Sequence, residues 1–257
     1  MTDQQRKQFD ADGHLLLREV IEADEIAVHR RAITEASRRL ITEDRPLAER
    51  DTYGKAFLQT MNLWLHDDAV KTFVFERKFA DIAAALLGVE KVRLYHDQAL
   101  FKEPGGGPTP WHQDQYYWPL DTDRTITMWM PLVDIDVGMG MLTFAAGSHR
   151  GGVVDDLAIS DESDQILAKY VKDNSFPVAR AESMKAGDAT FHLGTTIHTA
   201  GENRSNRLRE VMTVIYFADG ARVTEPRNEH QLADLETWLT PRNPGELADG
   251  PLNPILQ

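Results

Sequence analysis

The sequence contains no cysteine at all. This excludes disulfides and thiolate metal sites, so any bound metal must take its ligands from histidine, carboxylates, carbonyl groups or water. Long apolar runs are also missing. The longest, residues 82–89, is too short to cross a bilayer, which needs about 20 apolar residues. The first residues lack the apolar stretch of a signal peptide, so we expect a cytoplasmic location and no membrane contact.

Basic residues are in short supply as well. The chain has 28 Lys and Arg against 41 Asp and Glu, a formal net charge of −13. Nucleic acid and anionic membranes need a basic surface, so neither is expected as a partner. A small anionic molecule is not excluded, because a few well-placed arginines can bind one locally. We therefore expect a small-molecule substrate; the sequence leaves the oligomeric state open.

Helical patterns dominate residues 1–91. Apolar residues recur at seven-residue steps in one amphipathic segment, at Ile26, Ile33 and Leu40. Two shorter helices are predicted at residues 70–75 and 79–87, the second ending at Gly88. Residues 44–62 are less regular. We expect this part of the chain to form a mainly helical layer.

From residue 92 the pattern changes to β-strands. Short β-rich runs bounded by Gly, Pro and Asp span residues 92–101, 125–133, 141–146, 189–193 and 211–217. Such spacing is typical of a sandwich, jelly roll or barrel. An acidic, partly helical insertion is predicted at residues 151–180, and an irregular tail at 218–257. With 257 residues, we expect one domain that is mainly β, with helices packed against a core at 92–217.

The segment Trp111-His112-Gln113-Asp114 carries the clearest chemical signal. In a strand, positions i and i+2 point to the same face, so His112 and Asp114 would present an imidazole beside a carboxylate. A third ligand would complete the two-histidine, one-carboxylate set of non-haem Fe(II) oxygenases. Alone, a His-X-Asp triplet is a weak signal, since a solvated strand end gives the same pattern. A second segment, residues 187–198, ends in His198 and supplies a candidate third ligand.

Several motifs in the same order resemble the phytanoyl-CoA dioxygenase family. They are Trp111-His112-Gln113-Asp114, Trp129 in residues 127–132, Ala146-Gly147-Ser148-His149-Arg150, and His198 followed by Asn203 and Arg209. The similarity runs from about residue 92 to residue 217. Met139-Gly140 and Ala146 depart from the family's usual turn residues, which puts local turn geometry in doubt but does not affect the proposed ligands.

The resemblance implies a double-stranded β-helix, a cupin-like jelly roll. It also implies Fe(II) held by His112, Asp114 and His198, with 2-oxoglutarate and O2 as co-substrates. A dioxygenase of this kind hydroxylates or otherwise oxidises a small organic molecule and releases succinate and CO2. Related halogenases lack the carboxylate ligand. Asp114 therefore favours hydroxylation, desaturation or ring closure over halogenation.

Arg209 is the expected anchor of 2-oxoglutarate. On a core strand its guanidinium would need an anionic partner, because an unpaired buried charge is very costly. That partner is either the distal carboxylate of 2-oxoglutarate, as the resemblance implies, or an acid of the core. Arg207, two positions earlier, is the competing anchor. The family spacing favours Arg209.

Three further residues are weaker candidates for contact with the co-substrate. Trp129 either packs near it or is an ordinary core residue. Gln98 either donates a hydrogen bond to a carboxylate of 2-oxoglutarate or is satisfied by backbone, and Thr109 is a weaker candidate of the same kind. A core or supporting role is expected for His192.

The sequence says least about the substrate. Aromatic residues flank the metal motif and recur in residues 44–64; they line a pocket for a largely apolar or cyclic molecule, or belong to the core. Two other functions remain open. One is a cupin-like metal-dependent isomerase or 2-oxoglutarate-independent dioxygenase, which would need no Arg209 anchor. The other is a non-catalytic metal-binding module that retained the fold.

Overall fold

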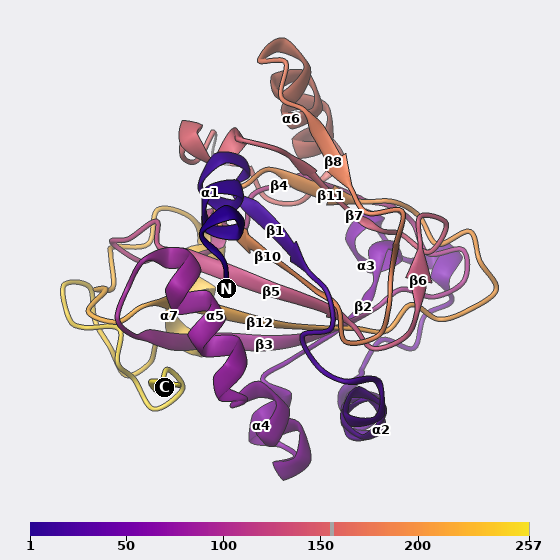
Figure 1. Ribbon diagram of the computed structural model, residues 1–257, viewed down its shortest axis with the longest axis horizontal. Coiled ribbons are helices and arrows are strands. Elements are labelled where there is room, and N and C mark those ends of the chain that lie inside the picture. Colours follow the sequence, from indigo (N-terminus) through magenta and orange to yellow (C-terminus); the bar gives the residue numbers. More distant parts are fainter. Residues whose placement is uncertain (155–156, 257) are drawn as a thin grey trace.

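Two facing β-sheets form the centre of the molecule. The computed structural model describes residues 1–154 and 157–256 (Figure 1). The larger sheet has six strands in the order β1-β10-β5-β12-β3-β2, and the smaller has four in the order β4-β11-β7-β8. Neighbouring strands pair antiparallel in both. This arrangement confirms the predicted jelly roll with flanking helices.

The strands of the larger sheet are β1 (His14–Leu17), β2 (Leu58–Met61), β3 (Val92–Phe101), β5 (Thr125–Pro131), β10 (Ala189–Leu193) and β12 (Val211–Ala218). Those of the smaller sheet are β4 (Thr109–His112), β7 (Leu142–Ala145), β8 (Val178–Arg180) and β11 (His198–Ala200). A separate pair joins β6 (Ile135–Asp136) to β9 (Ser183–Met184). The helices are α1 (Asp3–Asp12), α2 (Ala23–Leu40), α3 (Thr52–Ala56), α4 (Asp68–Val74), α5 (Arg77–Leu87), α6 (Asp161–Asp173) and α7 (Glu229–Trp238). Short 3-10 turns are η1 (Leu47–Glu49), η2 (Leu63–Leu65), η3 (Asp114–Tyr117) and η4 (Ser148–Gly151).

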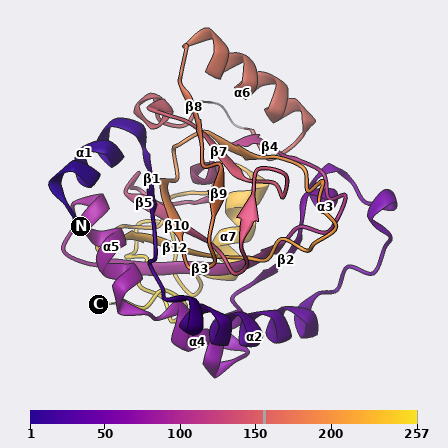
Figure 2. The ribbon, with the colours of Figure 1, turned by 45° about the vertical axis from the view of Figure 1, so that its right-hand side comes forward.

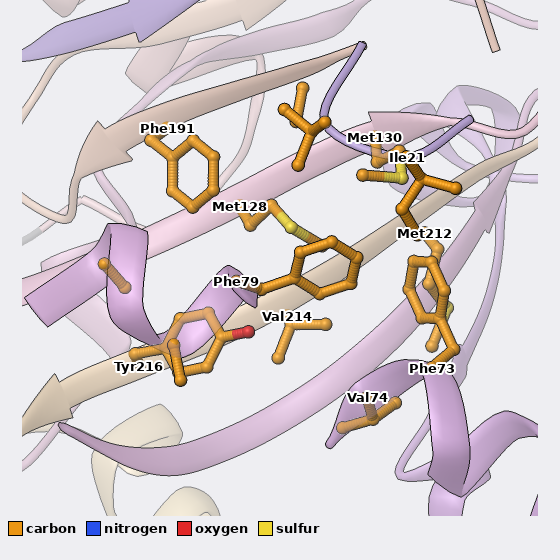
Figure 3. Packing of buried hydrophobic residues seen from close by; sticks show 14 of the residues in the cluster. Ile21, Phe73, Val74, Phe79, Met128, Met130, Phe191, Met212, Val214 and Tyr216 are labelled. Carbon is orange, nitrogen blue, oxygen red and sulfur yellow. The ribbon is translucent and has the colours of Figure 1, made fainter. Parts of the chain in front are cut away.

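The outer face of the larger sheet carries the main hydrophobic core. Helix α5 lies across β3, β5 and β12, and α4 and α2 continue this layer (Figures 1 and 2). Phe79 of α5 packs between Met128 of β5 and Val214 of β12, and all three residues are fully buried (Figure 3). Gly88 ends α5 in the left-handed conformation, with φ 65°, which glycine adopts without steric cost. The predicted helices at 26–40, 70–75 and 79–87 are thus confirmed.

The structure contains elements that were not predicted from the sequence. The mainly helical N-terminal part also supplies two strands, because β1 pairs with β10 and β2 pairs with β3 at the two edges of the larger sheet. These strands are only four residues long, so their stability comes from distant partners and not from a local pattern. The expected irregular tail contains α7. That helix is capped by Asn228, whose side chain accepts a hydrogen bond from the Gln231 amide.

The predicted insertion at 151–180 contains α6, and also β8, which extends the smaller sheet beside β7. Its residues 155–156 lie outside the described part of the chain. No helix within residues 1–154 and 157–256 is both long and apolar enough to cross a membrane.

Candidate metal centre

Three side chains predicted from two separate motifs meet between the two sheets. His112 ends β4, His198 begins the neighbouring β11, and the two residues are paired in register. Asp114 follows at the start of η3. One possible ligand atom from each residue lies within 4.8 Å of the others. The Asp114 Oδ1 atom is 3.5 Å from His112 Nε2 and 3.8 Å from His198 Nε2.

Backbone carbonyls orient both imidazoles. His112 Nδ1 lies 2.8 Å from the Pro110 carbonyl oxygen, and His198 Nδ1 lies 2.9 Å from that of Thr196. A carbonyl can only accept, so each Nδ1 carries the proton and each Nε2 keeps a lone pair facing Asp114. Such outer hydrogen bonds fix the tautomer and ring orientation of metal-binding histidines. Two neutral imidazoles and one carboxylate are the donor set that suits non-haem iron.

The protonation states agree with this orientation. Burial, followed by the neighbouring His112, lowers the pKa of His198 well below its ordinary value, so the imidazole stays neutral. Burial alone would raise the pKa of Asp114, but its close contacts with His198, His112 and His192 hold it well below its ordinary value. The carboxylate is therefore ionised at neutral pH.

The larger sheet holds the second oxygen of Asp114. Thr127 of β5 donates its hydroxyl to Oδ2 at 3.0 Å, and His192 Nε2 of β10 lies 3.3 Å from the same oxygen. The supporting role expected for His192 matches this contact. Thr127 was not predicted from the sequence as a residue of the site. Its position two residues before Trp129 could have indicated its place in the site, because residues two apart in a strand lie on the same face.

A cavity of about 240 Å³ opens beside the three side chains. Every further candidate from the sequence lines it, namely Gln98, Thr109, Trp129 and Arg209. Of the aromatic residues considered for the pocket, Tyr53, Phe57, Tyr117 and Trp118 line it, whereas Trp64 packs against Phe75. The sequence reasoning missed further polar residues of the wall, among them Gln59 of β2, Thr213 of β12 and Asp234 of α7. Asp234 accepts a hydrogen bond from the Tyr95 hydroxyl at 2.7 Å, and burial raises its pKa to about 7.

Arg209 is a buried cation without an acidic partner. Its side chain is 1% exposed, its Nη1 donates to the Gly140 carbonyl at 2.8 Å, and its guanidinium lies 5.5 Å from the Trp129 ring centre. Its Nε has no hydrogen-bond partner, and no carboxylate of residues 1–154 or 157–256 forms an ion pair with it. Burial lowers its pKa to about 9. The alternative of a core salt bridge is therefore not observed in the described chain.

Arg207, the competing anchor, points elsewhere. It is exposed, and its Nη2 lies 3.4 Å from the carbonyl oxygen of Asp134. It is absent from the cavity wall that Arg209 lines. The geometry favours Arg209.

Gln98 sits in a short chain of side-chain hydrogen bonds. Tyr53 donates its hydroxyl to Gln59 Oε1 at 2.8 Å, and Gln59 Nε2 donates to Gln98 Oε1 at 2.6 Å. The oxygen of the Gln98 amide is thereby used, which leaves its nitrogen as the donor on the cavity side. These hydrogen bonds connect β2, which carries Gln59, to Gln98 in the cavity wall.

Several known proteins resemble this chain in sequence. The family model of phytanoyl-CoA dioxygenase (PhyH) matches residues 9–211. A probable alpha-ketoglutarate-dependent hypophosphite dioxygenase of Stutzerimonas stutzeri is 28% identical over 170 residues, 65% of this chain and 59% of that protein. Phytanoyl-CoA dioxygenase 1 of Oryza sativa subsp. japonica is 24% identical over 249 residues, 83% of this chain and 88% of that protein.

Two solved structures share the fold over nearly the whole chain. The non-heme alpha ketoglutarate dependent carbocyclase SnoK, from nogalamycin biosynthesis, has a TM-score of 0.81 and 23% identity, and covers 100% of this chain and 97% of its own. The epimerase SnoN of the same biosynthesis has a TM-score of 0.79 and 25% identity, with coverages of 99% and 98%. Since the family model spans most of the sequence, including all three residues of the candidate metal centre, this chain belongs to the phytanoyl-CoA dioxygenase family.

Proposed function

We propose that the protein is an Fe(II)- and 2-oxoglutarate-dependent dioxygenase that oxidises a small organic molecule and releases succinate and CO2. One observation carries the proposal. The same cavity holds a two-histidine, one-carboxylate group and a buried arginine that has no acidic partner in the described chain. The first suits iron, and the second needs an anion such as the distal carboxylate of 2-oxoglutarate.

His112, Asp114 and His198 would hold the iron, because their free Nε2 and carboxylate oxygen atoms face one another. Bound iron supplies the activation of O2 and the oxidation of both co-substrate and substrate. The protein's own contribution is positioning. Thr127 and His192 fix the orientation of the carboxylate, as the carbonyls of Pro110 and Thr196 fix the two imidazoles.

Arg209 would bind the far carboxylate of 2-oxoglutarate. The Gly140 carbonyl occupies Nη1 and the Trp129 ring flanks the guanidinium, so both restrict its orientation before any ligand arrives. A guanidinium held in this way can donate two parallel hydrogen bonds to a carboxylate. Gln98 and Thr109, which line the same cavity, are proposed as further contacts of the co-substrate.

The substrate is proposed to be small and largely apolar or cyclic. Phe57, Tyr117, Trp118 and Ile159 give the cavity an apolar wall, broken by a few polar groups that include Asp234. Asp114 completes a full set of three ligands, which favours hydroxylation, desaturation or ring closure over halogenation. A cytoplasmic location remains part of this proposal.

A metal-dependent isomerase, or a dioxygenase that uses no 2-oxoglutarate, could employ the same three ligands. Neither would require Arg209 to be buried without an acid, which is why the 2-oxoglutarate enzyme is preferred. A non-catalytic module is disfavoured for the same reason, since a buried unpaired charge destabilises a fold that has no ligand to bind.

Anaerobic titration with Fe(II), with and without 2-oxoglutarate, separates these functions. The proposal expects a metal-to-ligand charge-transfer band that appears only when both are present, followed by succinate formation on exposure to O2. Iron binding without that band would favour the isomerase or the other dioxygenase. Iron binding with neither the band nor any turnover would favour the metal-binding module, and failure to bind iron would contradict the metal centre itself.

A further inference from the structure

Lys102 is a second buried cation beside Arg209. The two residues form an antiparallel bridge, in which the Lys102 amide donates to the Arg209 carbonyl at 2.9 Å and the Arg209 amide donates back at 3.0 Å. Directly opposed residues of such a pair direct their side chains to the same face. On β3, His96, Gln98 and Leu100 line the cavity, and Lys102 continues that alternation one step beyond the strand.

The Lys102 side chain is closed off from solvent and is not part of the cavity wall that Arg209 lines. It is 0% exposed, and its Nζ donates to the carbonyl of Gly107. Gly140 brings the two cations together. Its carbonyl accepts from Arg209, while a Cβ on Gly140 would lie 3.0 Å from Lys102 Cδ and 2.6 Å from the Gly201 carbonyl. Only glycine fits at this position, which also has φ 81°.

No acid among the described residues forms an ion pair with either of these cations. Among the charged groups near Lys102, Arg209 repels it and the exposed Glu202 attracts it more weakly; Glu202 itself lies 3.5 Å from Arg204. Burial, reinforced by Arg209, lowers the pKa of Lys102 to about 6. Without a bound anion, Lys102 is therefore mostly neutral at pH 7.5.

We propose that Lys102 takes up a proton when a carboxylate binds to Arg209, so that a second buried cation, placed outside the cavity wall, strengthens the hold of Arg209 on the distal carboxylate of 2-oxoglutarate. The inference rests on the proposed role of Arg209 as the co-substrate anchor. A bound carboxylate cancels the charge of Arg209 that Lys102 faces, and it adds an attraction of its own. Both changes favour the ammonium form, because opposite charges nearby stabilise the charged state of a group. Lys102 thus acts as a positioning residue through Arg209, without touching the iron ligands.

The linkage fixes the sign of the pH dependence. The bound state would have the higher Lys102 pKa and would carry more protons, so 2-oxoglutarate binds more weakly as the pH rises above about 6, where the free lysine loses its proton. Each unit by which the anion raises that pKa strengthens binding at low pH by about tenfold relative to high pH. The affinity levels off once the pH exceeds the pKa of the bound form.

Calorimetry measures this proton directly. Fe(II)-loaded protein is titrated anaerobically with 2-oxoglutarate at pH 7.2 in PIPES and in Tris, whose ionisation enthalpies differ. On binding 2-oxoglutarate, the wild-type protein should take up a measurable fraction of a proton. Lys102→Met should lack this fraction, and its affinity for 2-oxoglutarate should depend less on pH. Pyruvate is the matched ligand, since it keeps the keto-acid end but has no distal carboxylate. It should show no uptake that depends on Lys102.

The outcomes separate this inference from the proposed function. If 2-oxoglutarate does not bind, the proposed function fails and the inference fails with it. If it binds but wild type and Lys102→Met take up the same number of protons, only the inference is overturned. Equal uptake with pyruvate and 2-oxoglutarate in wild type would overturn it too, and this comparison stands even if the variant does not fold.

Discussion

The two faces of the six-stranded sheet have different roles. On the outer face, Met128 and Val214 pack under α5 in a dry apolar core. On the inner face, one residue along the same strands, Thr127 and Thr213 line the cavity together with Arg209. Every residue of β5 and β12 is buried, so burial alone does not distinguish the faces. Their chemistry does.

Unpaired polar atoms gather on the inner side. Buried atoms without a hydrogen-bond partner include His96 Nδ1, Thr190 Oγ1, His192 Nδ1 and Arg209 Nε, whereas the outer face contributes the Tyr216 hydroxyl. Such atoms are costly and need a reason. The apolar packing of the outer face can thus offset the cost of the unsatisfied groups on the inner face. Substitutions on the two faces should therefore separate folding from binding.

Asp114→Ala should give the largest functional effect. It removes the only carboxylate of the candidate metal centre, so oxidation that depends on 2-oxoglutarate should be lost and iron affinity should fall at least 10–100-fold, about the loss caused by removing a mere supporting residue. The fold should persist. Turnover assays and iron titration test this, with the exposed Asp134→Ala as control. Unchanged turnover would mean that the metal site lies elsewhere.

Phe79→Ala should have the opposite profile. Truncation of a fully buried phenylalanine leaves a cavity in the outer core and costs about 3–5 kcal/mol of unfolding free energy. Urea denaturation measures this loss, while iron and 2-oxoglutarate binding per folded molecule should stay unchanged. Val28→Ala, at a residue 66% exposed, should shift stability by less than about 0.5 kcal/mol. If Phe79→Ala weakened binding without loss of stability, the separation of the faces would be wrong.

Arg209→Ala tests the anion end of the inner face. Loss of one partner of a desolvated charge pair costs about 2–5 kcal/mol, or roughly 30- to several-thousand-fold in 2-oxoglutarate affinity. Iron binding should change little. Arg207→Ala is the matched control, and its exposure predicts a much milder effect. A larger loss for Arg207 would identify it as the anchor. If neither variant weakens binding, the co-substrate is not 2-oxoglutarate.

Thr127→Val should give the smallest measurable effect. Valine keeps the shape of threonine but removes the hydrogen bond to Asp114 Oδ2, so iron affinity should fall by about tenfold. Thr190→Val is the control on the neighbouring strand, because the Thr190 hydroxyl has no partner in the structure. It should leave iron affinity unchanged. Equal effects of the two substitutions would show that Thr127 does not position the carboxylate.

The sequence predicts those features whose signal is local. His112 ends β4 and Asp114 follows two residues later, and the long strands and amphipathic helices carry their own periodicity. Arg209 could be identified because its spacing from His198 matches the family. The lack of an acidic partner for it among the described residues, which gives that spacing physical meaning, required the structure.

Other features depend on distant partners and have no local signal. Strand β1 is defined by its pairing with β10, and the placement of Asp234 in the cavity wall depends on how α7 packs. Lys102 reads as an ordinary charged residue between Phe101 and Glu103. Only its opposition to Arg209 reveals that its ammonium is enclosed.

The edge position of β1 has a consequence for how the chain is made. His14 leaves the ribosome early, yet its partner His192 is synthesised 178 residues later (192 − 14). The pairing of β4 with β11 likewise joins His112 to His198. Contacts between such distant segments slow folding, so the metal-binding side chains come together only after most of the chain has been translated. Until then β1 has no partner strand. Loss of β1 by shortening the N-terminus would leave the β10 edge of the sheet open to other chains.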